Sequence, residues 1–133
     1  MIIWIASYPK SGNTWIRSFL TAYYFCENGI FDINKLNLIE DYPNKQFFKE
    51  KVKQGEIHKH WETSQKNIRD QKKVKFLKTH NSLITAFGND FTKPEYSLGV
   101  IYVIRDPRNV ITSVKNHNDL DSYDEALKFM QEE

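Results

Sequence analysis

The chain has 133 residues and a net charge of +2, with 40% hydrophobic and 27% charged residues, values ordinary for one soluble globular domain over residues 1–133. Its single cysteine, Cys26, excludes an internal disulfide and a cysteine-rich zinc site, and makes a reducing compartment, the cytoplasm, the default location. The longest apolar run, residues 1–6, is too short to cross a bilayer and has no basic flank before it, so neither a transmembrane helix nor a secretory signal is expected.

The first predicted elements are a strand and a helix. Residues 2–6 form an unbroken apolar run rich in β-branched side chains, typical of a strand buried on both faces of a parallel sheet. After a loop at residues 7–13, apolar residues recur at helical spacing and predict a buried helix from about Thr14, ended by Asn28 and Gly29. The predicted buried stripe consists of Trp15, Ile16, Phe19, Leu20, Tyr23 and Cys26.

The middle of the chain is polar and strongly basic. Its poor periodicity predicts only a break at residues 41–44 and short helices on either side of Gly55. Residues 45–78 hold eleven cations and four acids, a net charge of +7, whereas the rest of the chain holds eight cations and thirteen acids, a net of −5. This segment is either an anion-attracting patch or a solvated lysine-rich face without a partner. No nucleic-acid binding motif accompanies it, so nucleic acid is not expected as a partner.

Two more strands and two more helices complete the predicted fold. Short strands are expected at residues 74–78 and 97–104, the second fully buried. Asp106 and Pro107 are a typical N-cap and first residue of a helix that carries Val110, Ile111 and Val114, and a last helix is expected to begin with a capping box. The capping box is Ser122 with Glu125, and the apolar stripe after it is Tyr123, Ala126, Leu127 and Met130.

Strands that alternate with helices predict an α/β fold, with a parallel sheet and flanking helices. Ligands of such folds bind outside the carboxyl ends of the strands. We therefore expect the functional residues of this chain to lie at the ends of its three predicted strands.

At the first strand end, residues 8–15 read Tyr-Pro-Lys-Ser-Gly-Asn-Thr-Trp. Amides and the positive end of the helix dipole converge there, Gly12 lets the backbone approach a phosphate, and Lys10 adds a charge. Side chains able to donate hydrogen bonds to phosphate oxygens are Ser11, Asn13 and Thr14. The loop has neither Walker A nor dinucleotide-binding spacing, so ATPase and dinucleotide functions are not favoured, and a plain glycine turn is the remaining alternative.

This octapeptide resembles the 5′-phosphosulfate loop of the cytosolic-type sulfotransferases, which use 3′-phosphoadenosine 5′-phosphosulfate (PAPS) as sulfuryl donor. Residues 78–80, Lys-Thr-His, are similar to the position where this family has a catalytic histidine after a Lys-Thr pair. Arg105, with Ser113 eight residues later, is similar to the family's 3′-phosphate motif. Trp15 stands where the family places an aromatic side chain against adenine, and a position in the core is the competing interpretation.

The resemblance implies a P-loop-like, nucleotide-binding three-layer sandwich that is incomplete at its C-terminus. It also implies an enzyme that transfers a sulfuryl group from PAPS to the hydroxyl or amine of a small-molecule acceptor, without a metal. His80 would act as general base, because an imidazole with an unperturbed pKa of about 6.5 is mostly neutral at pH 7. Lys10 and Lys78 would offset developing negative charge, and Arg105 and Ser113 would bind the 3′-phosphate. Taken alone, Arg105 is equally explained by an ion pair with Asp106 or with an acid elsewhere in the chain.

The remaining predictions concern the other three histidines and the residues that bind PAPS. His58, His60 and His117 have no comparable setting and are interpreted as surface or structural residues. The residues expected to bind PAPS are Lys10, Ser11, Gly12, Asn13, Thr14, Trp15, Arg105 and Ser113.

The resemblance spans residues 8–113 and leaves 30–73 unmatched. Domains of this family are usually longer, with a C-terminal basic segment that closes over the 3′-phosphate, and nothing after Ser113 is similar to it. We therefore expect a partial domain, complemented by a partner chain or a second copy. The alternative function is a non-catalytic or degenerate module that binds adenosine 3′,5′-bisphosphate, and a magnesium-dependent P-loop kinase is the least favoured function.

Overall fold

The centre of the fold is a four-stranded sheet with the order β2–β3–β1–β6, in which every pairing is parallel. The computed structural model describes residues 1–48, 52–53 and 55–132. The strands are β1 (Ile2–Ser7), β2 (Glu40–Asp41), β3 (Lys75–Thr79) and β6 (Ser97–Val103). The predicted α/β class with a parallel sheet is confirmed, and the predicted strands are shifted by no more than one residue.

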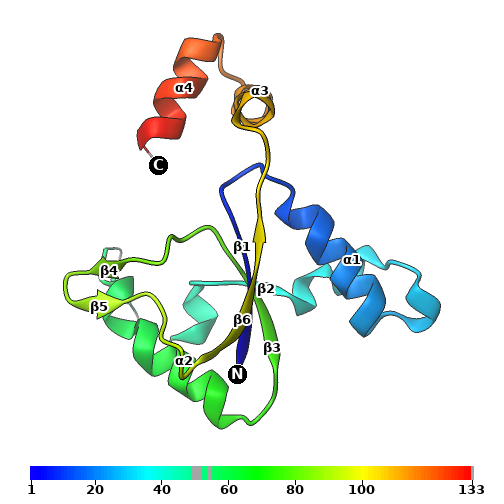
Figure 1. The fold of residues 1–133 in the computed structure, drawn as a ribbon, viewed down its shortest axis with the longest axis vertical. Coiled ribbons are helices and arrows are strands. Elements are labelled where there is room, and N and C mark those ends of the chain that lie inside the picture. Colours follow the sequence, from blue (N-terminus) through cyan, green and yellow to red (C-terminus); the bar gives the residue numbers. More distant parts are fainter. Residues whose placement is uncertain (49–51, 54, 133) are drawn as a thin grey trace.

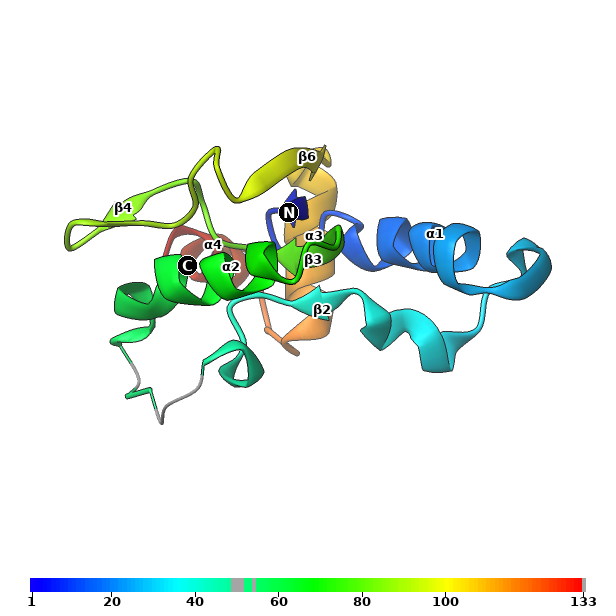
Figure 2. The ribbon, with the colours of Figure 1, turned by 90° about the horizontal axis from the view of Figure 1, so that it is seen from below.

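Helices and a hairpin cover the two faces of the sheet (Figures 1 and 2). One face carries α1 (Asn13–Phe25) and the short 3₁₀ helix η2 (Ile33–Leu38), and the other carries α2 (Trp61–Asp70) and the hairpin of β4 (Thr85–Ala86) and β5 (Asn89–Asp90). Beyond the carboxyl ends of the strands lie α3 (Pro107–His117) and α4 (Tyr123–Glu132). Three further 3₁₀ turns are η1 (Glu27–Gly29), η3 (Lys45–Phe47) and η4 (Ile57–His60), so short helices do flank Gly55.

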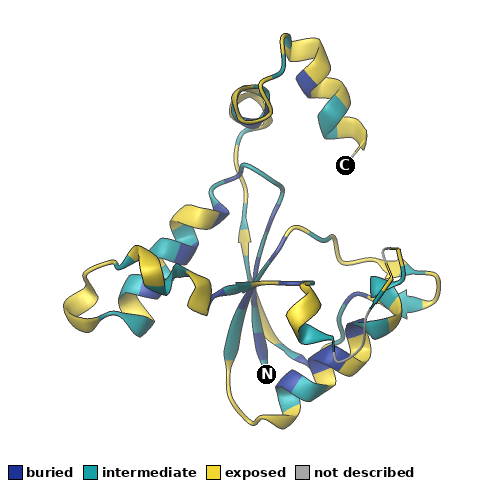
Figure 3. Cartoon of the chain, turned by 180° about the vertical axis from the view of Figure 1, so that it is seen from behind, coloured by how far each residue is buried: buried dark blue, intermediate teal, exposed yellow. Residues whose placement is uncertain are grey.

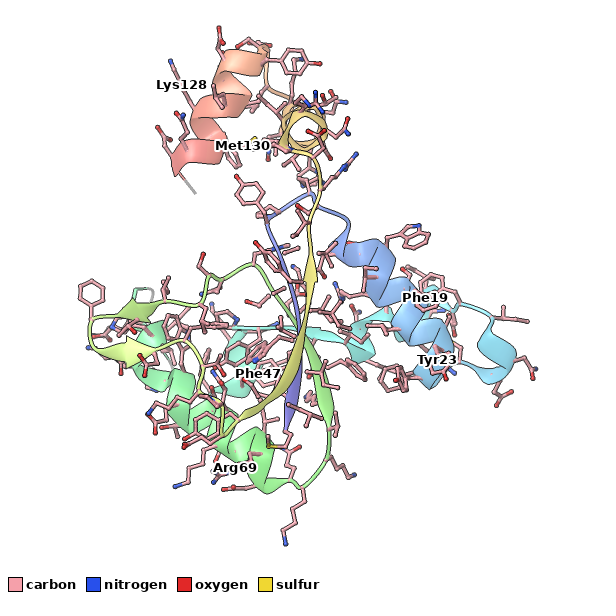
Figure 4. The ribbon with its side chains drawn as sticks, viewed as in Figure 1. Phe19, Tyr23, Phe47, Arg69, Lys128 and Met130 are labelled. Carbon is pink, nitrogen blue, oxygen red and sulfur yellow. The ribbon has the colours of Figure 1, made fainter. Side chains whose placement is uncertain are left out.

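The main core lies between the sheet and α2, and we call it the aromatic core. Its buried members are Ile2, Trp4, Tyr42, Trp61, Ile68, Leu77 and Phe91, and the half-buried Phe47 packs against them (Figure 4). The Trp4 ring lies 5.3 Å from Tyr42 and 5.3 Å from Phe91 between centroids, favourable separations for aromatic pairs. Gln65 Nε2 donates to the Phe91 carbonyl at 2.6 Å, so the buried amide also has a partner.

The prediction for the buried face of α1 is wrong. Its buried residues are Asn13, Arg17 and Thr21, whereas Trp15, Phe19 and Tyr23 are 75%, 62% and 71% exposed (Figures 3 and 4). Both sets repeat every four residues, so helical spacing alone cannot decide which set faces the sheet. Two members of the polar set bond to backbone carbonyls: Asn13 Nδ2 donates to Ile5 at 3.0 Å, and Arg17 Nη2 donates to Ile39 at 2.6 Å.

The prediction that the last strand is fully buried is also wrong. β6 is at the edge of the sheet order, and Val100 and Tyr102 on it are 61% and 65% exposed. An apolar run indicates a strand, but the neighbours of that strand are set by tertiary structure. The two-residue strands β2, β4 and β5 were not predicted, since such short segments carry no periodic signal.

The two C-terminal helices begin where the caps predict. The Asp106 side chain accepts from the Arg108 amide at 2.9 Å with Pro107 in the first turn, and Ser122 Oγ accepts from the Glu125 amide at 3.1 Å. The helices pack through Val110, Val114 and Ala126, with Ile111, Leu120, Phe129 and Met130 around them. In the stripe predicted for α4, however, Tyr123 and Leu127 are exposed. Across the described part of the chain, no helix combines the length and apolar character needed to cross a membrane.

Candidate functional site

The three predicted strand ends meet at one cavity of about 600 Å³. β1, β3 and β6 are neighbours in a parallel sheet, so their carboxyl ends lie at the same edge, below α3 and α4 (Figure 1). The predicted site residues that line this cavity are Lys10, Gly12, Asn13, Thr14, Lys78, His80 and Arg105. No Asp or Glu is among the described lining residues, so the charged side chains facing the space are cationic.

The loop after β1 turns sharply into α1. Gly12 is the N-cap, with a left-handed φ of 105°, and Lys10 also has a positive φ, of 63°. The amides of Trp15 and Ile16 bond to the Gly12 carbonyl at 3.0 and 3.2 Å, whereas the first amides of a helix have no intrahelical acceptor. Gly12 has no side chain that could accept hydrogen bonds from the first amides of α1. These first amides and the helix dipole therefore favour an anion in the cavity.

Two of the predicted phosphate donors are buried side chains. Asn13 is buried, and its Nδ2 donates to the Ile5 carbonyl at 3.0 Å and to Ser7 Oγ at 3.1 Å, so both amide hydrogens bond within the protein. Ser11 is buried and lines a smaller neighbouring cavity of about 240 Å³. Asn13 therefore fixes the loop against β1, a role that its residue type did not indicate.

His80 is held by the end of β1. Its Nδ1 lies 2.7 Å from the Ser7 carbonyl oxygen and 3.3 Å from Ser7 Oγ. Because a carbonyl oxygen only accepts hydrogen bonds, we assign the proton of the neutral ring to Nδ1. This tautomer leaves the lone pair on Nε2, which is the arrangement a histidine base requires. Thr79, the preceding residue, is buried and accepts from the Asn81 amide at 3.0 Å, which is a structural role.

Arg105 contacts the loop and not the neighbouring acid. Its Nη1 donates to the Lys10 carbonyl at 3.0 Å, which joins the third strand end to the first. Asp106 instead pairs with Arg108, at 2.6 Å between Oδ2 and Nη2, and this guanidinium holds the pKa of Asp106 below its usual range. The alternative in which Arg105 pairs with Asp106 is therefore not what the structure contains.

Ser11 and two further predicted site residues, Trp15 and Ser113, do not line this cavity, and several residues that do line it, among them His117, Asn118 and Phe129, were not predicted for the site. Trp15 is an exposed residue rather than a core residue, and Ser113 is half-buried on α3. The cavity wall formed by α3, its C-terminus and α4 instead presents His117, Asn118 and Phe129. His117 was interpreted as a surface or structural residue, although its position one helical turn after Ser113 was a usable signal.

The other two histidines, His58 and His60, lie next to aromatic side chains. The His58 ring lies 5.0 Å from Phe87 and 6.3 Å from Trp61, and the His60 ring lies 6.0 Å from Phe48, all between centroids. Within residues 1–48, 52–53 and 55–132, no cluster of three or more His, Cys, Asp or Glu side chains is placed to hold a metal ion.

A second, larger cavity of about 740 Å³ lies on the α2 side of the sheet. Its walls are mainly apolar, and include Trp4, Leu83, Phe91, Leu98 and Val100. Lys10, His80 and Arg105 do not line it. Lys10, Lys78, His80 and Arg105 thus share the cavity at the strand ends, whereas the larger cavity has Lys93 on its lining.

Comparison with known proteins gives one finding. The sequence matches the family model described as "Sulfotransferase domain" over residues 2–132. No curated protein matches the chain, and no solved structure matches it.

Proposed function

Because the chain belongs to the sulfotransferase domain family, we propose that it transfers a sulfuryl group from PAPS to a hydroxyl or amine of a small-molecule acceptor. Family membership supports sulfotransfer in general. One observation supports the specific reaction: a helix N-terminus, three cationic side chains and His80 share one cavity. The cations are Lys10, Lys78 and Arg105.

The cavity suits a nucleotide with phosphate groups at two positions. Lys10 and the amides around Gly12 would hold the 5′-phosphosulfate, since a helix N-terminus and an ammonium group both attract a phosphate. Arg105 reaches the same loop and suits a bidentate contact with the 3′-phosphate, with Ser113 as a further hydroxyl donor. The exposed indole of Trp15 is accessible to an adenine ring.

The chemical step follows from the position of the ionisable groups. When bound, PAPS supplies an activated sulfuryl group. His80 Nε2 would take the proton of the acceptor hydroxyl while Nδ1 keeps its bond to the Ser7 carbonyl. Lys10 and Lys78 would offset the negative charge that develops on the bridging oxygen and the leaving phosphate.

Turnover of sulfur-labelled PAPS with a panel of phenols, alcohols and amines tests the proposal. Wild-type protein should give labelled product, and His80→Asn should reduce the rate, because asparagine cannot take up the proton. His58→Asn is the matched control and should keep the wild-type rate, since His58 packs on aromatic rings away from the cavity. Calorimetric binding of adenosine 3′,5′-bisphosphate without any turnover would overturn the enzymatic function in favour of a nucleotide-binding module.

A further inference from the structure

We propose that Asp41 is a positioning residue for Lys78, and that Arg17 anchors Asp41 in this role. The inference rests on the proposed function, because it assigns a partner to a lysine expected to stabilise the leaving group. Asp41 is not among the residues that line the cavity, so it would act through Lys78 and not on the ligand.

The three side chains form a continuous ion-pair network. Asp41 is the register partner of Lys78 in the pairing of β2 with β3, and the Tyr42 amide donates to the Lys78 carbonyl at 2.7 Å. Asp41 Oδ1 lies 3.4 Å from Lys78 Nζ and 3.5 Å from Arg17 Nη1. The sheet pairing therefore fixes the backbone of Asp41 beside Lys78, and one carboxylate oxygen contacts both cations.

Arg17 is a rigid anchor for this carboxylate. It lies on the buried face of α1, and its Nη2 donates to the Ile39 carbonyl at 2.6 Å and to the Leu36 carbonyl at 3.3 Å. These bonds fix the guanidinium on the segment that leads into β2. Asp41 is thus held between a buried, immobile cation and the cation that lines the cavity.

The network explains how a flexible side chain can be held ready for the reaction. A lysine side chain has several rotatable bonds, and fixing it costs conformational entropy. The ion pair with Asp41 restrains Lys78 before a ligand binds, and the ammonium, which has three N–H groups, can still donate to oxygens in the cavity. The same carboxylate also lowers the positive potential of the cavity, so it should oppose anion binding slightly while it favours catalysis.

Glu40 provides a matched comparison on the same strand. It pairs with Lys75, and neither residue lines the cavity. The Asp41 side chain is 53% exposed, and exposed ion pairs contribute only about 0–1 kcal/mol to stability, so neutralising Asp41 should change the folding stability little. The Glu40 side chain is 27% exposed, so the melting temperature of each variant is measured beside its activity. A difference between the two variants in catalysis would therefore come from Lys78.

The experiment compares Asp41→Asn with Glu40→Gln. For Asp41→Asn we expect kcat to fall about tenfold, because a misplaced catalytic group loses transition-state stabilisation, while adenosine 3′,5′-bisphosphate binds equally or up to about threefold more tightly. Glu40→Gln should leave both quantities unchanged, and Asp41→Glu should recover part of kcat. A kcat of Asp41→Asn within twofold of wild type, or a parallel loss of kcat, affinity and melting temperature, would overturn the inference.

Labelling of lysines with an amine-reactive reagent, read by mass spectrometry, separates this inference from the proposed function. Absence of turnover by the wild-type protein would contradict the proposed function, but the ion pair would still shield Lys78 from the reagent. Asp41→Asn should then increase the labelling of Lys78 and not of Lys75, and Glu40→Gln should do the reverse. Unchanged labelling of Lys78 in Asp41→Asn would overturn the proposed pairing.

Discussion

The aromatic core and the cavity at the strand ends are built from the same strands but have opposite character. β1 supplies Trp4 to the core and Ser7 to the support of His80, and β3 supplies Leu77 to the core and Lys78 to the cavity. The core is apolar and buried, whereas the cavity at the strand ends is lined by cations. The residues that stabilise the fold and the residues proposed to act in the reaction therefore occupy different parts of the same strands. Substitutions in the core should lower the stability, and substitutions in the cavity should lower the activity or the affinity.

The largest effect is expected in the cavity, for His80→Asn. Loss of a general base lowers the rate by about 10²–10⁴-fold, and an asparagine amide can still donate to the Ser7 carbonyl. The thermal melting temperature should stay close to that of wild type, because no core contact is removed. A large drop in melting temperature together with the rate would show that His80 belongs with the stabilising region.

Phe91→Ala should give the largest effect in the aromatic core. Phe91 is buried against Trp4, Tyr42 and Trp61, and such truncations cost about 3–5 kcal/mol of unfolding free energy. Urea denaturation followed by tryptophan fluorescence measures this cost. The fraction that remains folded should bind adenosine 3′,5′-bisphosphate as wild type does, and a weaker affinity of the folded fraction would contradict the separation of the two regions.

Arg105→Ala sharpens the comparison within the cavity. A hydrogen bond to a charged group contributes about 1.5–3 kcal/mol, so the affinity for adenosine 3′,5′-bisphosphate should fall about 10–100-fold by calorimetry. Arg108→Ala is the control, because its guanidinium is exposed and pairs with Asp106. Equal affinities of the two variants would exclude Arg105 from the nucleotide site.

The smallest effect is expected for Tyr42→Phe. Tyr42 Oη lies 2.7 Å from Ser64 Oγ, and loss of this buried hydrogen bond should cost about 1 kcal/mol near neutral pH. Burial raises the pKa of Tyr42, so its stabilising contribution is complete below pH 10, the ordinary pKa of the phenol, and is lost as the pH rises further. The difference in stability between wild type and the variant should therefore narrow above pH 10, and a constant difference would contradict this.

Features that depend on adjacent residues were predicted correctly from the sequence, whereas features that depend on tertiary contacts were not. The apolar run of β1 and the Asp106 cap depend on a few adjacent residues, and both are in the structure as expected. Which face of α1 is buried depends on the bonds of Arg17 to a distant segment, which no periodicity contains. The exposure of β6 depends likewise on its place at the sheet edge.

The same distinction between local sequence features and tertiary contacts applies to the candidate site. Parallel strands bring Lys10, Lys78, His80 and Arg105 to one edge, so their proximity could be inferred from strand order alone. The internal bonds of Asn13 depend on side-chain packing, and no motif indicated them. The part of the cavity wall that includes His117 depends on how α3 folds back over the strand ends, and the sequence carried only its helical spacing as a signal.

A crystal structure of the protein with adenosine 3′,5′-bisphosphate tests the central claim most directly. We predict the 5′-phosphate at the amides around Gly12, the 3′-phosphate at the Arg105 guanidinium, and the His80 ring beside the 5′ end. A nucleotide bound in the apolar cavity near Trp4, or phosphates out of reach of both Lys10 and Arg105, would contradict the assignment of this cavity.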